Sequence, residues 1–544
     1  MQEYFAQEDK NDPRNSTPHV YAVANRARYR LVHGFGKINQ VIVISGESGA
    51  GKTFNARRAL DFLAARNEIV SKTSHLDIHA DKSCKTIIHK IANVIPLVSA
   101  FTTARTTRNM KSSRHGQMLR LQYDERCVIR GASIHSFLFE RTRVTECSDN
   151  FEIFYQLLYG LSEEEIAELL LSRDQNYTVL GIRNSRDSCS LAEEFRETVA
   201  SFKALDFTDE CRVDIFRVIA FLVHLGNIRF DKTIGEGISI DLANEDSKNA
   251  LKNACSLISL PEYELTQLLT STIICPQSSG GRHSSYRRYF KTTDDCRNRL
   301  FSIARFIYDR LFNRLVERVN EILHDTGNNY NWLGLLDIFG FESFDYNGLE
   351  QLCINYATER LQLYFMEDYL EAGQRELEEE GLVTLPTSVS IELYRDRIFV
   401  IENIVFSTFD DASRSPIALK SSTLLQQMHA KQKGKSGFLV TKNNVFMIEH
   451  YSCPVEYNVN NLLSKNTDKV GWETRERKIF VGDEKNNIVI ESSKLLCMSR
   501  YHRNYRLYSA IVKISCCSRC WKSSKKVSLK HVALAANRPP LWPN

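Results

Sequence analysis

Residues 41–53, V-I-V-I-S-G-E-S-G-A-G-K-T, decide the fold of this chain. The stretch begins with apolar β-branched residues, a composition typical of a buried strand. The strand leads into a loop of small residues, and such a loop wraps a triphosphate because its backbone N–H groups can approach the phosphate oxygens. Lys52 adds a mobile positive charge, and Thr53 offers a hydroxyl to Mg²⁺ at the start of a helix. The stretch therefore predicts a nucleoside triphosphate site with the phosphate-binding residues Gly46, Glu47, Ser48, Gly49, Ala50, Gly51, Lys52 and Thr53.

Composition limits the class of protein. The chain has 544 residues, of which 43% are apolar and 25% charged, so it can bury a large core and hold several subdomains. Its net charge of +5 is small for this length and gives no argument for a nucleic-acid partner. No apolar run is long enough for a membrane span, and the polar N-terminus lacks a signal-peptide core. The 14 cysteines are mostly scattered singly, which favours a reducing, cytoplasmic setting over a disulfide framework.

Apolar periodicity predicts the elements around the loop. Residues 333–338 predict a second buried strand, and residues 349–380 predict one long helix with a charged end. An earlier helix should stop at Pro96, because proline interrupts helical hydrogen bonding. The helix that starts at Thr53 buries an apolar side formed by Ala56, Leu60, Phe62 and Leu63.

Two further stretches carry polar side chains next to predicted strands. The first is T-R-N-M-K-S-S-R-H-G at 107–116, which precedes an alternating strand. The second is L-L-D-I-F-G-F-E at 335–342, where Asp337 ends a hydrophobic strand. An Asp at the end of a buried strand is the usual Mg²⁺-side carboxylate of a P-loop enzyme, and the N–H of Gly340 can turn toward a γ-phosphate. A glycine-rich turn, a Ser-Ser-Arg loop or a D-x-x-G turn alone can be purely structural, but together and in this order they indicate one nucleotide site.

With these motifs the chain resembles the myosin motor domain. G-E-S-G-A-G-K-T at 46–53 is the P-loop of that family, and S-S-R at 112–114 lies in its switch one. L-D-I-F-G-F-E-S-F at 336–344 is similar to switch two, and L-E-Q-L-C-I-N-Y-A at 349–357 to the start of the relay helix. Shorter similar stretches are P-H-V-Y-A-V-A at 18–24, N-F-E-I-F-Y-Q-L-L at 150–158, H-L-G-N-I at 224–228, H-Y-S-C-P-V-E-Y at 450–457 and K-N-T-D at 465–468.

The resemblance implies an α/β fold. We expect a P-loop NTPase core with a mixed, mainly parallel central sheet surrounded by helices, and with large helical insertions. Residues 1–17 would be a polar lead-in, 18–470 a partial motor domain, and 471–544 a divergent, poorly ordered basic tail. Within the motor domain the expected segments are the P-loop at 46–53, switch one at 109–116, switch two at 337–342, the relay helix at about 349–380 and a lower actin-facing part at about 385–470.

The resemblance also implies a role for each residue at a matching position. The P-loop residues would hold the phosphates, and Asn109 would position the γ-phosphate. The metal ligands would be Thr53, Ser113 and, through water, Asp337. The catalytic group, which positions the γ-phosphate and the attacking water and closes the site, would be Ser112, Arg114, Gly340 and Glu342, with Arg114 and Glu342 joined as an ion pair. Such a set suits phosphoryl transfer, which needs positioning and charge neutralisation more than a strong base.

The implied function is that of an actin-based motor head with ATP and Mg²⁺ as cofactors. Actin filaments would be the partner, and the protein would act in the cytoplasm at the actin cytoskeleton. No heptad run indicates a coiled-coil dimer, so we expect a monomer. The actin contact would include residues 404–429 and the basic loop of Lys431, Lys433 and Lys435, although a solvated loop is an equal alternative. A rival function is a non-motor actin-binding scaffold that holds nucleotide with little turnover, and a third is an unrelated small-molecule kinase.

Several positions depart from the family pattern. The adenine-contacting loop that precedes P-H-V-Y-A-V-A in the family was not found, and His115 replaces a phenylalanine. Lys111 replaces a polar residue beside the phosphates, where it either strengthens nucleotide retention or blocks closure. After about residue 470 we find no converter, lever or light-chain site, so we expect impaired force production. Cys517 and Cys520 have metal-ligand spacing, but a disordered basic tail is the favoured interpretation there.

Overall fold

The computed structural model describes most of the first 460 residues and few of the later ones. The expected lead-in at 1–17 and most of the expected tail lie outside the described residues. The described ranges are 18–33, 39–73, 86–146, 149–181, 188–233, 237–274, 286–325, 331–382, 391–414, 420–432, 438–442, 444–460, 462, 478–481 and 488–491.

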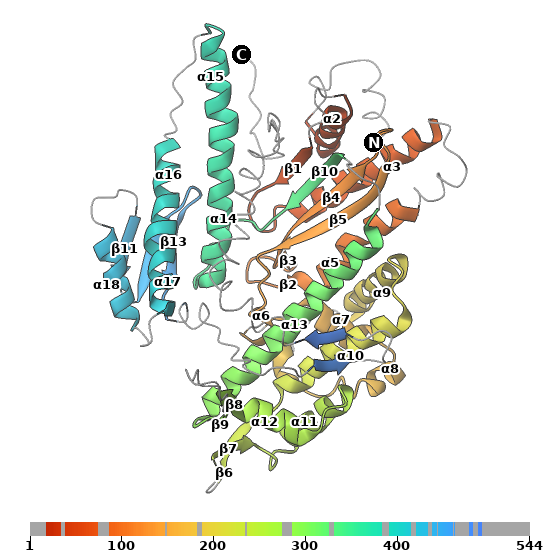
Figure 1. Cartoon of the computed structure of the whole chain (residues 1–544), viewed down its shortest axis with the longest axis vertical. Helices are drawn as coiled ribbons and strands as arrows, with labels where there is room; N and C mark the ends of the chain where they lie inside the picture. The colour runs from red at the N-terminus through yellow and green to blue at the C-terminus, as the bar shows by residue number, and fades with distance from the viewer. Residues whose placement is uncertain are drawn as a thin grey trace, which may run out of the picture.

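A four-stranded sheet lies at the centre of the fold, in the order β1-β10-β4-β5 (Figure 1). The strands are β1 (Gln40–Ile44), β10 (Asn331–Asp337), β4 (Gly116–Tyr123) and β5 (Ile129–Phe137). Strand β1 is parallel to β10, whereas β10 is antiparallel to β4 and β4 to β5. The expected mixed sheet is confirmed, but "mainly parallel" is wrong for the described strands. The reason is that β4 and β5 are joined by a tight turn, in which the Asp124 carboxylate accepts the N–H groups of Arg126 and Val128, and such a hairpin is antiparallel.

The register of the sheet brings separate loops to one edge. Ile44, the last residue of β1, pairs with Asp337, the last residue of β10. On the other side Asp337 pairs with Gln117, near the start of antiparallel β4. The loops that follow β1 and β10 and the loop that precedes β4 therefore meet, as ligand-binding loops do at the carboxyl ends of parallel strands.

Helices α2 (Val20–His33) and α3 (Lys52–Thr73) pack against each other and against β1 and β10. The residues expected on the buried side of α3 are fully buried, each exposing at most 1% of its surface. The long helix α13 (Thr293–Leu323) packs along β5. Pro96 does not end a helix: it lies in the first turn of α5 (Val94–Thr102), where a missing N–H breaks no helical hydrogen bond.

The remaining elements of the first half form a large helical part below the sheet in Figure 1. None of the described helices is both long and apolar enough to cross a membrane. Two short hairpins, β6–β7 (Phe230–Thr233 and Gly237–Ile240) and β8–β9 (Ser271–Ile274 and Tyr286–Tyr289), accompany these helices. The helices are α6 (Arg143–Glu146), α7 (Glu152–Gly160), α8 (Glu163–Glu168), α9 (Ser188–Ala204), α10 (Asp209–Gly226), α11 (Glu245–Leu257) and α12 (Glu262–Thr270).

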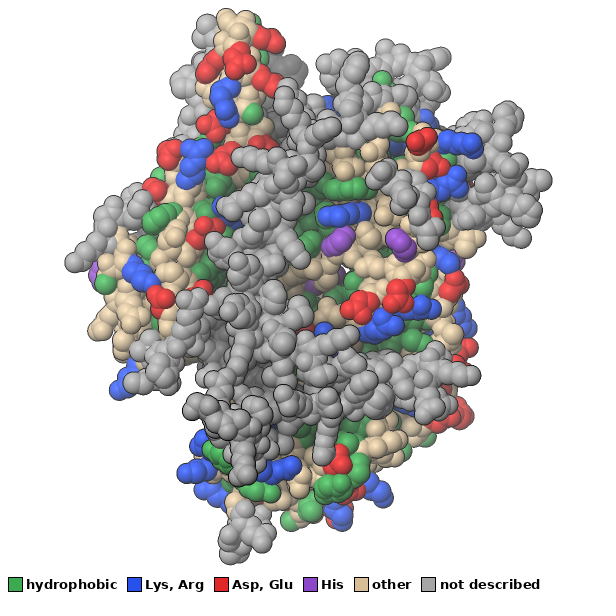
Figure 2. All heavy atoms as spheres, in the orientation of Figure 1, with side chains coloured by type: hydrophobic (Ala, Val, Ile, Leu, Met, Phe, Trp, Pro, Cys, Tyr) green, Lys and Arg blue, Asp and Glu red, His purple; other side chains and the backbone are tan. Residues whose placement is uncertain are grey.

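The predicted long helix is present as one rod (Figure 1). It consists of α14 (Leu349–Phe365), a π-helical turn (Met366–Glu371) and α15 (Ala372–Glu379). The charged end is α15, where acidic side chains gather on the face seen in Figure 2.

A second hydrophobic core joins α14 to the elements that follow it. These are α16 (Ile391–Val400), a second π-helical turn (Ile401–Phe406), α17 (Ser407–Arg414), α18 (Ser421–Lys431), β12 (Val445–Glu449) and β13 (Pro454–Asn458). Strand β11 (Phe438–Lys442) pairs with β12. The strands β14 (Lys478–Val481) and β15 (Ile488–Glu491) pair with each other.

Candidate nucleotide site

The phosphate-binding loop curls around the side chain of its own lysine. The Lys52 ammonium donates to the carbonyl oxygens of Glu47 at 2.7 Å and Gly46 at 3.2 Å. Burial lowers the pKa of Lys52, although Asp337 and other acidic groups act in the opposite direction. Gly49 has φ +87°, a left-handed conformation that favours glycine. Helix α3 starts at Lys52, so its unpaired N–H groups and positive dipole end lie at this loop.

The residues expected to form switch one, 109–116, begin within a small hairpin that approaches the loop. Strands β2 (Thr103–Ala104) and β3 (Ser112–Ser113) pair, with Thr103 opposite Ser113. Asn109 lies in the connection between them, and its side chain is 3.9 Å from the point where a Cβ on Gly49 would be. The hairpin therefore places Asn109 against the phosphate-binding loop.

Switch two touches the same loop from the end of β10. The Thr53 hydroxyl donates to the Asp337 carboxylate at 2.7 Å. Burial raises the pKa of Asp337, against the opposing effects of Thr53 and Lys52. Gly340 approaches so closely that an added Cβ would lie 2.3 Å from the backbone nitrogen of Ser48, so no side chain fits there.

Arg114 and Glu342 form the expected ion pair. The distance from Arg114 Nη1 to Glu342 Oε1 is 2.5 Å, and from Nη2 to Oε2 3.2 Å. The side chains are 0% and 2% exposed. Arg114 Nη1 also donates to the hydroxyl of Ser112 at 3.0 Å. Two parallel charge-assisted hydrogen bonds thus connect switch one to switch two inside the protein.

Glu140 is a third member of this cluster, and the sequence did not reveal it. Its carboxylate accepts from Arg114 Nε at 2.5 Å and from Arg143 Nε at 3.0 Å. Burial acts to raise the pKa of Glu140, but the two arginines outweigh it and lower the pKa to about 2. Glu140 follows β5, 26 residues after Arg114, and only the β4–β5 hairpin brings the two together.

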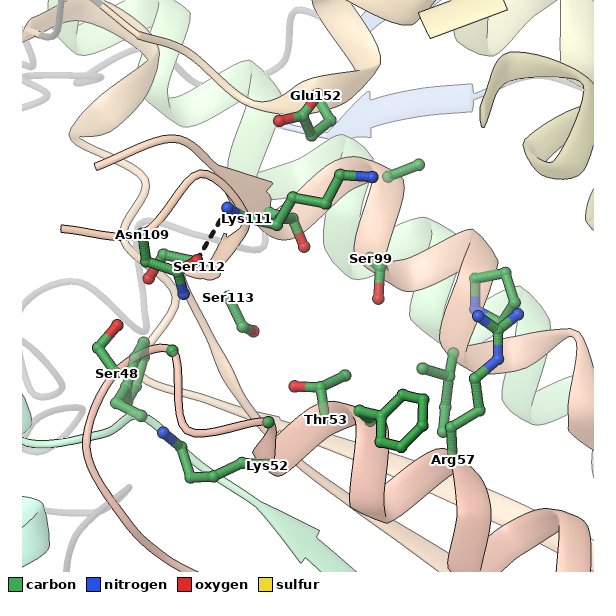
Figure 3. Close-up of a pocket in the computed structure, with 18 of the residues that line it drawn as sticks. Ser48, Lys52, Thr53, Arg57, Ser99, Asn109, Lys111, Ser112, Ser113 and Glu152 are labelled. Atoms are coloured by element: carbon green, nitrogen blue, oxygen red, sulfur yellow. Dashed lines mark hydrogen bonds between the residues drawn. The ribbon is translucent and has the colours of Figure 1, made fainter. Parts of the chain in front are cut away.

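These loops enclose a cavity of about 410 Å³, a size typical of small-molecule sites (Figure 3). Ser48 and Lys52 lie at one end and Arg57 at the other, while Thr53 and Ser113 point into the space between them (Figure 3). Of the predicted site residues, those that line the cavity are Ser48, Gly49, Gly51, Lys52, Thr53, Asn109, Ser112, Ser113, Gly340 and Glu342. Those that do not line it are Gly46, Glu47 and Ala50 in the loop, and Arg114 and Asp337 behind the cavity wall.

Comparison with known proteins agrees with this geometry. The family described as "Myosin head (motor domain)" matches residues 2–491. The chain belongs to the myosin head family. The resemblance drawn from the motifs is confirmed, and the match extends beyond residues 18–470 at both ends.

Individual myosins are similar over most of this chain. Myosin-4 of Saccharomyces cerevisiae is 32% identical over 470 residues, which cover 83% of this chain and 30% of that protein. Unconventional myosin-XIX of Homo sapiens is 33% identical over 484 residues, which cover 86% of this chain and 48% of that protein. The chain therefore spans between about a third and a half of the length of these relatives.

In this myosin head, Lys111 points toward α9, which forms part of the cavity wall. Its ammonium pairs with Glu194 of α9 at 2.5 Å, and the lysine side chain is 61% exposed. Arg57 of α3 pairs with Glu197, one turn further along α9, at 2.6 Å. Two ion pairs that the sequence did not predict thus attach α9 to switch one and to the P-loop helix.

The oxygen donors at the phosphate end fit Mg²⁺. Thr53, Ser113 and Asp337 offer two hydroxyls and one carboxylate, the hard ligands that Mg²⁺ takes beside phosphate oxygens. Thr53 and Asp337 are already in contact, and the Ser113 hydroxyl donates to the carbonyl of His115 at 3.0 Å.

The segment expected to face actin is described only in part. Lys431 donates to Asp411 at 3.0 Å and to the Ser407 hydroxyl at 2.9 Å, and so ties α18 to α17. Lys433 and Lys435 lie outside the described residues, as do Cys517 and Cys520.

Proposed function

We propose that this myosin head binds and hydrolyses Mg²⁺-ATP and couples that reaction to binding of actin filaments. The observation that carries the proposal is the cavity, which three loops distant in sequence enclose together. One of them is the phosphate-binding loop, and the Arg114–Glu342 ion pair joins the other two. Membership of the motor-domain family supports ATP as the nucleotide and actin as the partner.

The phosphate end of the cavity would hold the triphosphate. Lys52 is free to exchange the carbonyl oxygens of its own loop for phosphate oxygens, which are stronger acceptors because they carry charge. Thr53, Ser113 and Asp337 would hold Mg²⁺, which when bound neutralises charge on the phosphates.

The closing residues would organise hydrolysis. Ser112 and Glu342 line the cavity and are both hydrogen-bonded to Arg114, so their orientation is fixed before nucleotide arrives. Gly340 and Asn109 approach the phosphate-binding loop from opposite switches, where they would contact the γ-phosphate. Preorganised donors and exclusion of bulk water are the main sources of catalysis in phosphoryl transfer.

Switch two is also fastened to the long helix. The backbone N–H of Glu342 donates to the Asn355 side chain at 2.9 Å, and Asn355 donates back to the carbonyl of Glu342 at 2.7 Å. Asn355 lies on α14. A displacement of Glu342 that depends on nucleotide would therefore be passed to α14, which supports coupling of the site to a larger motion.

Single-turnover ATP hydrolysis tests the site. We expect Lys52→Ala to lose nucleotide binding and Glu342→Ala to bind ATP but hydrolyse it at least about a hundred-fold more slowly, as when an oxyanion-type contact is removed. Glu317→Ala, which changes an exposed ion pair on α13, should match the wild type. Wild-type protein that binds no ATP, or site variants that hydrolyse it at the wild-type rate, would show that the proposal is wrong.

Co-sedimentation with actin filaments tests the coupling. We expect the protein to sediment with actin in the absence of nucleotide and to be released by ATP. Binding that is indifferent to ATP would favour the non-motor scaffold, and no binding would remove actin from the proposal.

A further inference from the structure

An exposed aromatic side chain lies on the wall of the nucleotide cavity. Phe54 directly follows Thr53 in the first turn of α3, lines the cavity and is 61% exposed. Leaving a phenylalanine exposed forgoes the free energy gained by burying it. Because the exposed ring lines a cavity of the size of small-molecule sites, a ligand bound there can cover it.

The helix that carries Phe54 leads away from the phosphate end of the cavity. Helix α3 runs from Lys52 toward Arg57, and these two residues mark opposite ends of the cavity (Figure 3). Ile95 and Pro96 of α5 also line the cavity. The lining of the cavity therefore includes an aromatic ring and aliphatic groups besides the phosphate-binding residues.

Neighbouring charges hold the ring in place. The Arg58 guanidinium carbon is 4.9 Å from the centroid of the Phe54 ring, a cation–π distance. Arg58 also pairs with Asp61 at 3.3 Å, and Arg57 is held by Glu197. The ring is thus fixed by its own helix, so a ligand would lose little entropy in ordering it.

We propose that Phe54 is the platform on which the base of the nucleotide stacks. This rests on the proposed function, because a triphosphate held at Lys52 directs the ribose and base along α3 toward Phe54. Aromatic rings and nucleobases stack through their π faces with no need for hydrogen bonds. Phe54 then determines how tightly the nucleoside half of ATP is held, independently of the phosphates.

Calorimetric titration of the full chain with Mg²⁺-ATP and with Mg²⁺-tripolyphosphate separates the two halves of the ligand. We expect Phe54→Ala to weaken ATP binding about ten-fold, within the range measured for loss of one stacked aromatic, and to leave tripolyphosphate binding unchanged. Phe54→Tyr should bind ATP as the wild type does. Phe54→Leu, which keeps the apolar area but not the π face, should resemble Phe54→Ala.

Leu242→Ala is the matched control, because Leu242 is a large apolar side chain, 54% exposed, outside the cavity lining. The platform is wrong if Phe54→Ala binds ATP with wild-type affinity, or if it loses ATP and tripolyphosphate equally. In both cases, binding of tripolyphosphate by the wild-type protein would leave the proposed function intact. Wild-type protein that binds neither ligand would overturn both proposals.

Discussion

Arg114 holds two carboxylates at once, and only Glu342 belongs to a recognisable motif. Glu140 is held beside Arg114 by the β4–β5 hairpin, which does not include switch two. Breaking a buried ion pair is costly mainly because it leaves an unpaired charge. With Glu140 in place, Arg114 remains paired when Glu342 moves away. Opening of the site then costs less than it would for an isolated pair.

Replacement of Glu140 should therefore destabilise the protein. In Glu140→Gln the two arginines lose the buried carboxylate that they share, and we expect a loss of about 3 kcal/mol in the free energy of unfolding, seen as a drop of several degrees in apparent melting temperature. Glu321→Gln removes a partner from exposed arginine pairs on α13 and should cost less than about 1 kcal/mol. Equal shifts in the two variants would contradict the role given to Glu140.

At the scale of elements, α14 is tied to the second core by a line of buried polar groups. Asn355 donates to the Tyr457 hydroxyl at 2.8 Å, and this hydroxyl lies 2.8 Å from His450 Nε2. His450 Nδ1 lies 3.0 Å from Glu359, one turn beyond Asn355 on α14. A His450 protonated on Nδ1 gives each of these hydrogen bonds one donor and one acceptor. The helix that carries Asn355 is therefore fixed to β13 on the side that also holds Glu342.

Tyr457→Phe tests this line. The variant keeps the ring but removes a buried hydrogen-bond partner from both Asn355 and His450, which should cost about 1–3 kcal/mol in the free energy of unfolding. Apparent melting temperature is the measurement, and Tyr346→Phe, at an exposed tyrosine near switch two, is the control. A Tyr457→Phe variant as stable as the control would show that the line adds nothing to stability.

The elements differ in how far the sequence predicted them. The phosphate-binding loop, β1, β10 and the start of α14 at Leu349 depend on residues adjacent in the chain, and all were predicted. Pro96 was misinterpreted because the effect of proline depends on its place in a helix turn. Glu140 and Glu194 reach the site through a hairpin and through packing of α9, which no local pattern encodes. The apolar periodicity of residues 349–380 predicts one continuous helix and does not indicate the π-helical turn at Met366–Glu371.

At the scale of the whole molecule, switch two links the phosphate-binding loop to the second hydrophobic core. Gly340 lies against the phosphate-binding loop, whereas the next residue, Phe341, belongs to the second core. The centroid of the Phe341 ring lies 5.4 Å from that of His450 and 5.6 Å from that of Tyr451. Two adjacent residues thus pack into different parts of the protein, so a shift of switch two would change the packing of both parts.

Acid stability is a second property of the whole molecule, and His115 affects it. Its ring packs edge-on against Phe312 beside the larger core, and burial lowers its pKa from 6.5 to about 3. Between these values the unfolded chain binds a proton that the folded protein does not, so stability is lost as pH falls through this window, by at most about 1.4 kcal/mol per pH unit. Above pH 6.5 the histidine imposes no such loss.

His115→Phe should remove this dependence. We expect the apparent melting temperature of the variant to fall less than that of the wild type between about pH 7.5 and about pH 5. His429→Gln, at an exposed histidine on α18, should follow the wild type. If His115→Phe loses as much stability on acidification as the wild type does, the buried imidazole is not the titrating group.

The pairing of β1 with β10 has a consequence for sequence change in this protein. Ile44 and Asp337 occupy matching positions in the backbone ladder, and each is followed by its own loop. A slip of one residue between these strands would turn the Asp337 carboxylate to the opposite face of the sheet, away from Thr53. The main-chain hydrogen bonds between these strands therefore determine which face of the sheet carries the Asp337 carboxylate. An insertion or deletion of one residue within either strand would therefore break this arrangement.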